Sequence, residues 1–502
     1  MAHSEQMAPV DATWLRMDRP TNLMVIVGVL KLAGPVKVKM LEKLLAERLL
    51  GYRRFRQRAE TRPAGIWWVD DRHFDVSRHI HHIRLPGAGG DAELEQLVGD
   101  LASTPLDHSI PLWQFHIVEK FEGGAAVVAR IHHAIADGIA LMGVMLSLTD
   151  EMHAMAKMEG GRRTQKADDE EDHDGALSGL FAPVAQAFKM GSKVASPLLK
   201  NVGDITANPA KALDLIKTGS GVVNELAWLL TMPDDSATSL KGKPLGAKRV
   251  AWTDPLPLGE IKAVGKALGC SVNDILLSAV AGAIGSYLVD QGEPTEGVEI
   301  RAVIPVNLRQ QMATPELGNS FGLVALELPV GIEHPVERLF EVRKRMDVLK
   351  NSVQAPVVFG LLSVLGYAPK MAQDLLFDFL LDRTTAVMTN VPGPQFQLAI
   401  AGSPVTQIMF WVPQASNVGM GVSILSYNGK VQFGLMTDAA LTPEPRRIID
   451  NFGPQFEQLL YFTLMDESFG EAEEPAVPPA PAIARKPRAL KAKASGRRSS
   501  VG

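Results

Sequence analysis

Apolar residues along this chain gather in short runs, and the spacing of these runs predicts a mixed α/β protein. In the first third of the chain, residues 24–32, 113–119 and 125–132 are apolar stretches with the length of buried strands. Residues 36–50 repeat apolar side chains every three or four positions, which is typical of an amphipathic helix, and residues 138–155 predict a second, more apolar helix. These elements predict an N-terminal α/β domain.

The second half of the chain repeats this organisation from about residue 247 onward. Ser271 stands where an N-cap is expected, before an apolar helix that runs to Leu288. Asn428-Gly429, between two strand-like runs, is typical of a tight β-hairpin. The pattern predicts a second α/β domain, whose other elements are strands over 300–306 and 321–328 and helices over 335–352 and 441–465.

Two segments differ in composition from the predicted domains. The acidic run 168–174 favours a solvated linker over a metal site. Residues 177–230 predict a helical crossover, which also offers apolar faces to lipid. The expected organisation is an N-terminal domain over 1–158, the linker and crossover over 159–246, a C-terminal domain over 247–470 and a disordered Pro/Ala-rich basic tail over 471–502.

Composition narrows the classes of protein that fit. Hydrophobic residues make up 46% of the 502 residues and charged residues 21%, as in an ordinary globular protein. The net charge of −5 argues against a general nucleic-acid binder. The single cysteine, Cys270, excludes internal disulfides and cysteine-based zinc sites. No signal peptide is visible and no apolar run reaches the roughly 18–20 residues that span a bilayer, so any membrane contact is expected to be peripheral.

The strongest candidate for chemistry is the segment that follows the predicted strand 125–132. It reads His132-His133-Ala-Ile-Ala-Asp137-Gly138 and leads directly into an apolar helix. A histidine at the end of a strand is held rigidly, and imidazole suits general-base chemistry near neutral pH. The alternative is a buried structural pair, and a second pair, His81-His82, lacks the Asp-Gly that makes this pattern specific.

Three further motifs accompany this segment in a characteristic order. They are Pro111-Leu112-Trp113, Asn273-Asp274 and Asn390-Val391-Pro392-Gly393. Together with His132-His133-Ala-Ile-Ala-Asp137-Gly138, they make the chain similar to bacterial wax ester synthase/diacylglycerol acyltransferases. That family belongs to the HHxxxDG superfamily of chloramphenicol acetyltransferase and condensation domains. The resemblance implies an α/β (α+β) fold of two chloramphenicol-acetyltransferase-like domains with mixed sheets, joined by a helical crossover, with the active site in a channel between them.

The same resemblance implies a reaction and its participants. A long-chain acyl group passes from acyl-CoA, a substrate rather than a cofactor, to a fatty alcohol or to diacylglycerol. His133 is then the general base, without a covalent acyl-enzyme, and His132 supports it. No metal is expected. The absence of a GxSxG motif argues separately against a serine hydrolase.

The other motif residues have roles that we leave open or assign to structure. Asn273 either offers its amide near the reaction centre or caps a helix with Asp274. Pro111, Leu112 and Trp113 form a packing element or part of a channel wall. Asn390, Val391, Pro392 and Gly393 form a turn that brings one domain onto the cleft of the other. Gly138 permits a tight loop, and Asp137 braces it through a salt bridge to Arg309, because related enzymes pair the motif aspartate with an arginine.

Two other functions remain as alternatives at this point. One is a stand-alone condensation domain that forms amides on carrier-bound substrates. The other is a non-catalytic protein of lipid-inclusion surfaces. The basic residues of the tail predict attraction to anionic lipid. We therefore expect a cytoplasmic protein that is peripherally associated with the inner membrane or with lipid inclusions.

Overall fold

The computed structural model describes residues 4–154 and 225–465, apart from residues 35, 226, 227, 230, 308–318, 320 and 366–369. The predicted acidic linker, most of the predicted crossover, the tail and Arg309 therefore lie outside the described residues.

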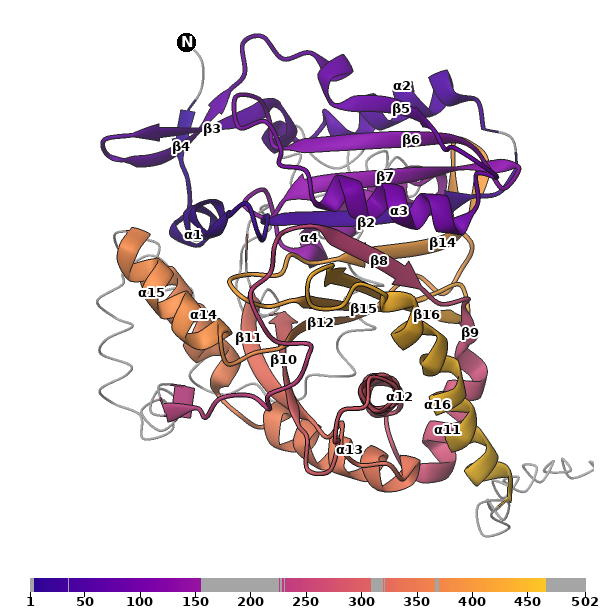
Figure 1. Cartoon of the computed structure of the whole chain (residues 1–502). Helices are drawn as coiled ribbons and strands as arrows, with labels where there is room; N and C mark the ends of the chain where they lie inside the picture. The colour runs from indigo at the N-terminus through magenta and orange to yellow at the C-terminus, as the bar shows by residue number, and fades with distance from the viewer. Residues whose placement is uncertain are drawn as a thin grey trace, which may run out of the picture.

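A six-stranded sheet forms the upper half of the molecule (Figure 1). Its strands lie in the order β13-β14-β2-β7-β6-β5. Helix α3 packs on one face, where Lys31 pairs with Asp91 at 2.5 Å, and α4 packs on the other face against Ala129 and Ile131. The elements are β2 (Val25–Leu32), β5 (Ile80–Arg84), β6 (Trp113–Phe121), β7 (Gly124–His132), β13 (Ala399–Ile400), β14 (Ser403–Trp411), α2 (Val38–Leu49), α3 (Asp91–Ala102) and α4 (Gly138–Ser147).

A second mixed sheet lies below the first and carries most of the helices of the C-terminal half. Its strands follow the order β11-β10-β12-β15-β16-β8, with β9 beside β16. The strands are β8 (Lys248–Trp252), β9 (Leu256–Pro257), β10 (Ile300–Asn307), β11 (Phe321–Leu328), β12 (Ala386–Pro392), β15 (Met420–Tyr427) and β16 (Lys430–Asp438). The helices are α11 (Leu258–Leu268), α12 (Val272–Asp290), α13 (Pro335–Lys350), α14 (Gln354–Leu365), α15 (Lys370–Leu381) and α16 (Pro445–Met465).

The strand β14 departs from the predicted division into two separate domains. It follows the C-terminal half in sequence, yet it pairs antiparallel with β2 over residues 405–411 and completes the N-terminal sheet. Its buried positions Ile408 to Trp411 make it apolar enough for the interior of either sheet, so local pattern does not decide which sheet it joins. The predicted boundary at residue 247 therefore separates the two halves in sequence only. In space they interlock, because β14 of the C-terminal half belongs to the N-terminal sheet.

Most predicted elements are confirmed, with two kinds of exception. The hairpin forms with Asn428 and Gly429 at φ 47° and 74°, and Ser271 caps α12. Helix α4 ends at Ser147, earlier than predicted. Helices α1 (Pro9–Met17), α3, α11, α14 and α15 were not predicted. Figure 1 shows α1 below the first sheet beside α14 and α15, so these helices lie where the two halves meet.

Among the described residues, α12 alone has the length and hydropathy of a membrane-crossing helix. However, 78% of its apolar window is buried inside the protein. Its neighbours are α11, α13 and α16, which identifies α12 as the core helix of the C-terminal half.

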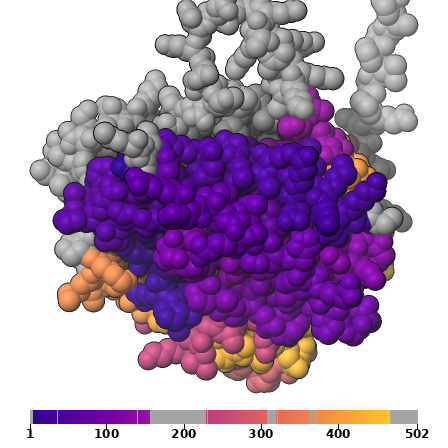
Figure 2. All heavy atoms as spheres, turned by 90° about the horizontal axis from the view of Figure 1, so that it is seen from above, coloured from indigo at the N-terminus to yellow at the C-terminus, as the bar shows by residue number. Residues whose placement is uncertain are grey.

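Seen from above, the N-terminal half forms nearly all of the coloured surface (Figure 2). Residues of the C-terminal half emerge only at its margins. A small sheet of β1 (Ser4–Gln6), β4 (Gly65–Asp70) and β3 (Gln57–Arg62) extends this half to one side in Figure 1.

Candidate active site

The two histidines lie where β7 ends and α4 begins, as predicted. His132 is the last residue of β7, and Asp137 is the N-cap of α4, whose carboxylate accepts a hydrogen bond from the Ala140 amide at 2.8 Å. A carboxylate at this position satisfies an otherwise unpaired helix amide and interacts favourably with the helix dipole. Asp137 therefore braces the loop, which agrees with its predicted structural role.

His133 is enclosed by aromatic rings on an apolar wall. Its ring stacks on Trp14 with centroids 4.4 Å apart and lies 5.5 Å from the ring of Phe321. It is 3% exposed, and its Nδ1 makes no hydrogen bond within the described part of the chain. Burial lowers the pKa of His133 to about 4, although the negative charge of Asp137 opposes this shift. The imidazole is therefore neutral near pH 7, which is the state that a general base requires.

A large apolar cavity lies between the two halves and reaches His133. It contains about 1510 Å³ of space, including its opening to solvent. Its walls come from α1, β10, β11, α14, α15 and β12 and from residues 410–418. Among the described lining residues, the polar side chains are His133, Asp137, Gln354, Thr384, Thr389 and Asn390. The cavity thus combines an interior with few polar groups and a neutral imidazole on its wall.

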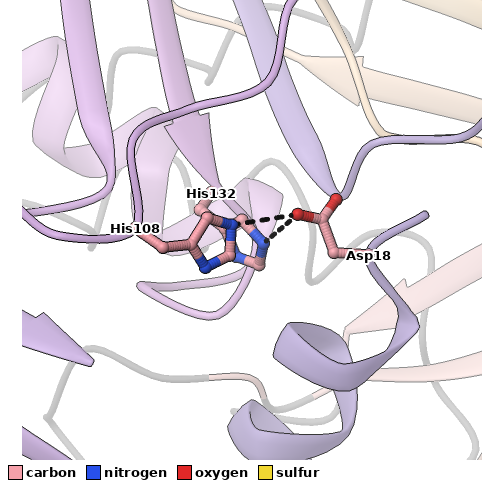
Figure 3. A group of neighbouring side chains, drawn as sticks. All are labelled: Asp18, His108 and His132. Carbon is pink, nitrogen blue, oxygen red and sulfur yellow. Dashed lines mark hydrogen bonds and ion pairs between the residues drawn. The ribbon is translucent and has the colours of Figure 1, made fainter. Parts of the chain in front are cut away.

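His132 points away from this cavity, because successive strand residues face opposite sides of a sheet. Figure 3 shows its ring and that of His108 converging on one carboxylate oxygen of Asp18. The Nε2–Oδ2 distances are 3.2 Å from His108 and 3.7 Å from His132. Burial by itself raises the pKa of Asp18, but hydrogen bonds from His108 and the Met24 amide, together with the nearby His132 imidazole, outweigh it and hold the pKa below its usual range. His132 is therefore a support for the loop.

The three side chains Asp18, His108 and His132 lie close enough together to hold a divalent cation. The Nδ1 of His132, however, accepts a hydrogen bond from the Ala134 amide at 3.0 Å. Nδ1 therefore carries a lone pair, and the proton of the neutral ring sits on Nε2, which faces Asp18. A metal on Nε2 needs the opposite tautomer, so this geometry favours a hydrogen-bonded group over a metal site.

Gly138 does not serve the role that we predicted for it. Its φ lies outside the left-handed region, and a Cβ built there would approach only Val412 and Phe410, at 3.7 and 3.8 Å. The loop therefore does not require glycine for its conformation. Gly138 lines the large cavity and also a smaller apolar cavity beneath α4, so the missing side chain leaves space between the two.

The Pro111-Leu112-Trp113 motif is a packing element rather than a channel wall. All three residues are buried, and none lines the large cavity. The Trp113 indole stacks on His79 and donates to the Phe55 carbonyl at 2.8 Å. The Leu112 carbonyl accepts the His132 amide at 3.0 Å, so this motif supports the histidine segment through the backbone.

The structure joins the two asparagine motifs. The Asn390 amide donates to the side-chain oxygen of Asn273 at 2.7 Å, and Asn390 with Val391 lines the cavity. Asp274 is buried and closes the capping box with Ser271. Asn390, Val391 and Pro392 belong to β12 rather than to a turn, and the chain leaves the strand at Gly393, where a Cβ would collide with the Ser426 carbonyl. Asn273 thus reaches the cavity only through Asn390.

Sequence reasoning missed four residues around His133. Trp14 and Asp11 come from α1, Asn319 stands just before β11, and Phe321 is the first residue of β11. A signal for α1 was present, because Pro9 is followed by Val10, Trp14 and Met17 at helical spacing. No local signal identifies Asn319, which is 186 positions from His133 in the chain and contacts its backbone.

The predicted Asp137–Arg309 salt bridge involves a residue outside the described part of the chain, so it stays a prediction. If it forms, Asp137→Asn and Arg309→Ala should each lower stability and activity, because each strands the other charge. A double-mutant cycle on the free energy of unfolding measures the coupling, and additive effects of the two substitutions would contradict the pair.

Buried neutral histidines predict acid sensitivity of the fold. Burial lowers the pKa of His133 to about 4 and that of His116, whose ring is 6% exposed, to about 3. Unfolded histidines titrate near pH 6.5, so below that pH the unfolded chain binds more protons and stability falls. Each group contributes about 1.4 kcal/mol per pH unit. Asp11, whose pKa burial raises to about 6, acts in the opposite direction.

The His116→Leu variant tests this expectation. The free energy of unfolding is measured in urea at pH 6.5 and pH 5. Between these pH values it should fall by about 2 kcal/mol less in His116→Leu than in the wild type. The control is His82→Ala, because that ring is 38% exposed. An unchanged pH dependence in His116→Leu would show that this histidine is not held neutral.

Solved structures share this arrangement of two halves. The chain superimposes on the starter condensation domain of rhizomide synthetase with a TM-score of 0.52 at 12% identity, covering 92% of this chain and 93% of that one. It superimposes on the wax ester synthase/diacylglycerol acyltransferase of Marinobacter aquaeolei with a TM-score of 0.64 at 22% identity, covering 92% of this chain and all of that one. The fold is therefore that of the condensation-domain class.

Comparison of sequences identifies the family within this class. The wax ester synthase/diacylglycerol acyltransferase catalytic domain matches residues 7–276, and the C-terminal domain of the same family matches residues 317–460. A probable diacylglycerol O-acyltransferase of Mycobacterium tuberculosis is 27% identical over 441 residues, which cover 86% of this chain and 90% of that protein. The chain belongs to the wax ester synthase/diacylglycerol acyltransferase family and is an acyltransferase.

Proposed function

We propose that this protein transfers a long-chain acyl group from acyl-CoA to the hydroxyl of a fatty alcohol or of diacylglycerol, with His133 as general base. The observation that carries the proposal is the position of His133, a neutral buried imidazole on the wall of the apolar cavity. The family membership supports acyl transfer that forms wax esters or triacylglycerol.

The proposed reaction needs one base and no covalent intermediate on the protein. His133 takes the hydroxyl proton as the oxygen attacks the thioester carbonyl, and the new C–O bond gives a tetrahedral intermediate. The C–S bond then breaks, and the imidazolium returns its proton to the leaving thiolate. The cavity supports this chemistry by keeping bulk water, a competing nucleophile, away from the thioester.

The cavity also supports long-chain substrates. Each methylene moved from water to an apolar wall gains about 0.8 kcal/mol. Long chains therefore gain more from the cavity than short ones. The cavity wall takes residues from both halves, so both halves are expected to contribute to substrate binding.

An assay with two acceptors tests the proposal. The purified protein receives radiolabelled palmitoyl-CoA with either hexadecanol or diacylglycerol, and the lipid products are separated by chromatography. We expect a labelled ester with at least one acceptor and release of one CoA per ester. Amide formation with an amine acceptor alone would instead support a condensation enzyme, and no product with any acceptor would refute acyl transfer from CoA.

The location of the protein is a separate proposal, which rests on the basic residues of 485–502. We expect peripheral binding to anionic vesicles that weakens with salt, because ions screen the attraction. Deleting residues 471–502 should reduce vesicle binding in a flotation assay and leave turnover of soluble short-chain substrates unchanged. Loss of that turnover would show that the tail belongs to the active structure.

A further inference from the structure

Three segments that are distant in sequence meet at the backbone of His133. They are helix α1, the turn after β7 and the start of β11. The side-chain nitrogen Nδ2 of Asn319 donates to the His133 carbonyl at 2.9 Å and to Asp11 Oδ1 at 2.8 Å. The backbone amide of Asn319 also donates to Asp11 Oδ1, at 3.2 Å.

The orientation of the Asn319 amide follows from its partners. A carbonyl and a carboxylate both accept hydrogen bonds, so the NH₂ group must face them. Asn319 is 7% exposed and Asp11 is 3% exposed. Loss of either side chain would leave the other buried without a partner, which is costly, so the two side chains fix each other's orientation.

The same segments bring the rings that enclose His133. Trp14 lies three residues after Asp11 on α1, and Phe321 lies two residues after Asn319. The Asp11–Asn319 hydrogen bonds therefore set the separation of the two aromatic rings. The His133 backbone is held on its other side as well, since its amide donates to the Met24 carbonyl at 2.7 Å.

We propose that Asn319 is a positioning residue for His133 and that Asp11 orients the Asn319 amide. Asn319 fixes the peptide that carries the base, and Asp11 fixes the amide and the spacing of the enclosing rings. This inference rests on the proposed function, because positioning affects turnover only if His133 is the base. Neither residue is among the described residues that line the cavity, so both act through His133 rather than on a substrate.

The first test is Asn319→Ala. It removes the donor to the His133 carbonyl, and misplacement of a base by about 1 Å lowers kcat by roughly 10²-fold. KM should stay within about threefold, because the cavity wall that binds the chains is unchanged. The matched control is Asn22→Ala, another buried asparagine that joins the two halves, through the Ser416 carbonyl at 2.5 Å. It should lower thermal stability and leave kcat unchanged.

An exchange of the two side chains separates positioning from mere stabilisation. Asn319→Asp places a carboxylate against Asp11 and the His133 carbonyl, so it should lower both the thermal midpoint and kcat. In the Asp11→Asn/Asn319→Asp double variant, the new amide donates to the new carboxylate, so the midpoint should rise well above that of Asn319→Asp. It still gives no donor to the His133 carbonyl, so kcat should stay low. Recovery of kcat together with the midpoint would overturn the proposal.

A second readout does not depend on activity. Diethyl pyrocarbonate modifies neutral imidazoles, and peptide mass spectrometry measures the rate at His133, with the exposed His82 as internal standard. Asn319→Ala should raise the rate at His133 severalfold because its ring is released, and Asn22→Ala should not. If the wild-type protein transfers no acyl group, the proposed function fails, but the modification rate still tests whether Asn319 positions His133. An unchanged rate in Asn319→Ala would overturn the positioning role.

Discussion

Replacing His133 by alanine is expected to remove nearly all turnover while the protein stays folded. Loss of a general base costs roughly 10²–10⁴-fold in rate. The described residues lining the cavity include no second histidine, and Asp137 is engaged as a helix cap. The initial rate of ester formation from palmitoyl-CoA is the measurement. His133→Gln, which keeps a polar side chain of similar size, should be similarly inactive.

The control for this prediction uses the other histidine pair. His82→Ala changes an exposed ring, so it should keep wild-type turnover. His132→Ala should cost less in turnover than His133→Ala and more in thermal stability, because its ring is fully buried and joined to Asp18. A folded His133→Ala protein with wild-type turnover would exclude this histidine as the base.

Filling the cavity at Ala325 is expected to change the preferred chain length. Ala325 lies on β11, is half-buried and lines the cavity. In Ala325→Trp, the indole should displace three or four methylenes of a long substrate, at about 0.8 kcal/mol each. The value of kcat/KM for palmitoyl-CoA with hexadecanol should therefore fall roughly 100-fold. Butyryl-CoA with butanol should react nearly as in the wild type.

The matched control places the same tryptophan on the surface. Val348 on α13 is 68% exposed, so Val348→Trp should leave both reactions unchanged. Equal losses for long and short substrates in Ala325→Trp would indicate a disturbed fold rather than a filled cavity, and no loss with either would show that the chains bind elsewhere.

The sequence predicted the elements whose signals are local. The run before His132 is continuous and apolar, so the pattern of apolar residues was enough to predict the strand and the turn into α4. Helix α1 was missed because it has only nine residues, although Val10, Trp14 and Met17 keep helical spacing. Helices α14 and α15 were missed because residues 353–381 are apolar on more than one face, as expected for a cavity wall.

The surroundings of the candidate site depend on contacts that no local pattern records. Asp18 follows α1 and meets His132 inside the N-terminal half, and Asn390 on β12 meets Asn273 inside the C-terminal half. In each pair the two residues are more than 100 positions apart in the chain, so only tertiary packing brings them together. The four motifs found in the sequence did locate the site, but their roles needed coordinates. Pro111-Leu112-Trp113 serves packing, and Asn273 reaches the cavity only through Asn390.

The place of β14 in the N-terminal sheet has a consequence during synthesis. Its partner strand β2 leaves the ribosome long before β14 does, since about 270 residues separate β7 from β14. At about 5–20 residues per second, β2 waits on the order of tens of seconds with an open, apolar edge. We infer that the nascent N-terminal half depends on chaperones during this interval. Cells that produce residues 1–246 alone would accumulate aggregated protein rather than a folded N-terminal half.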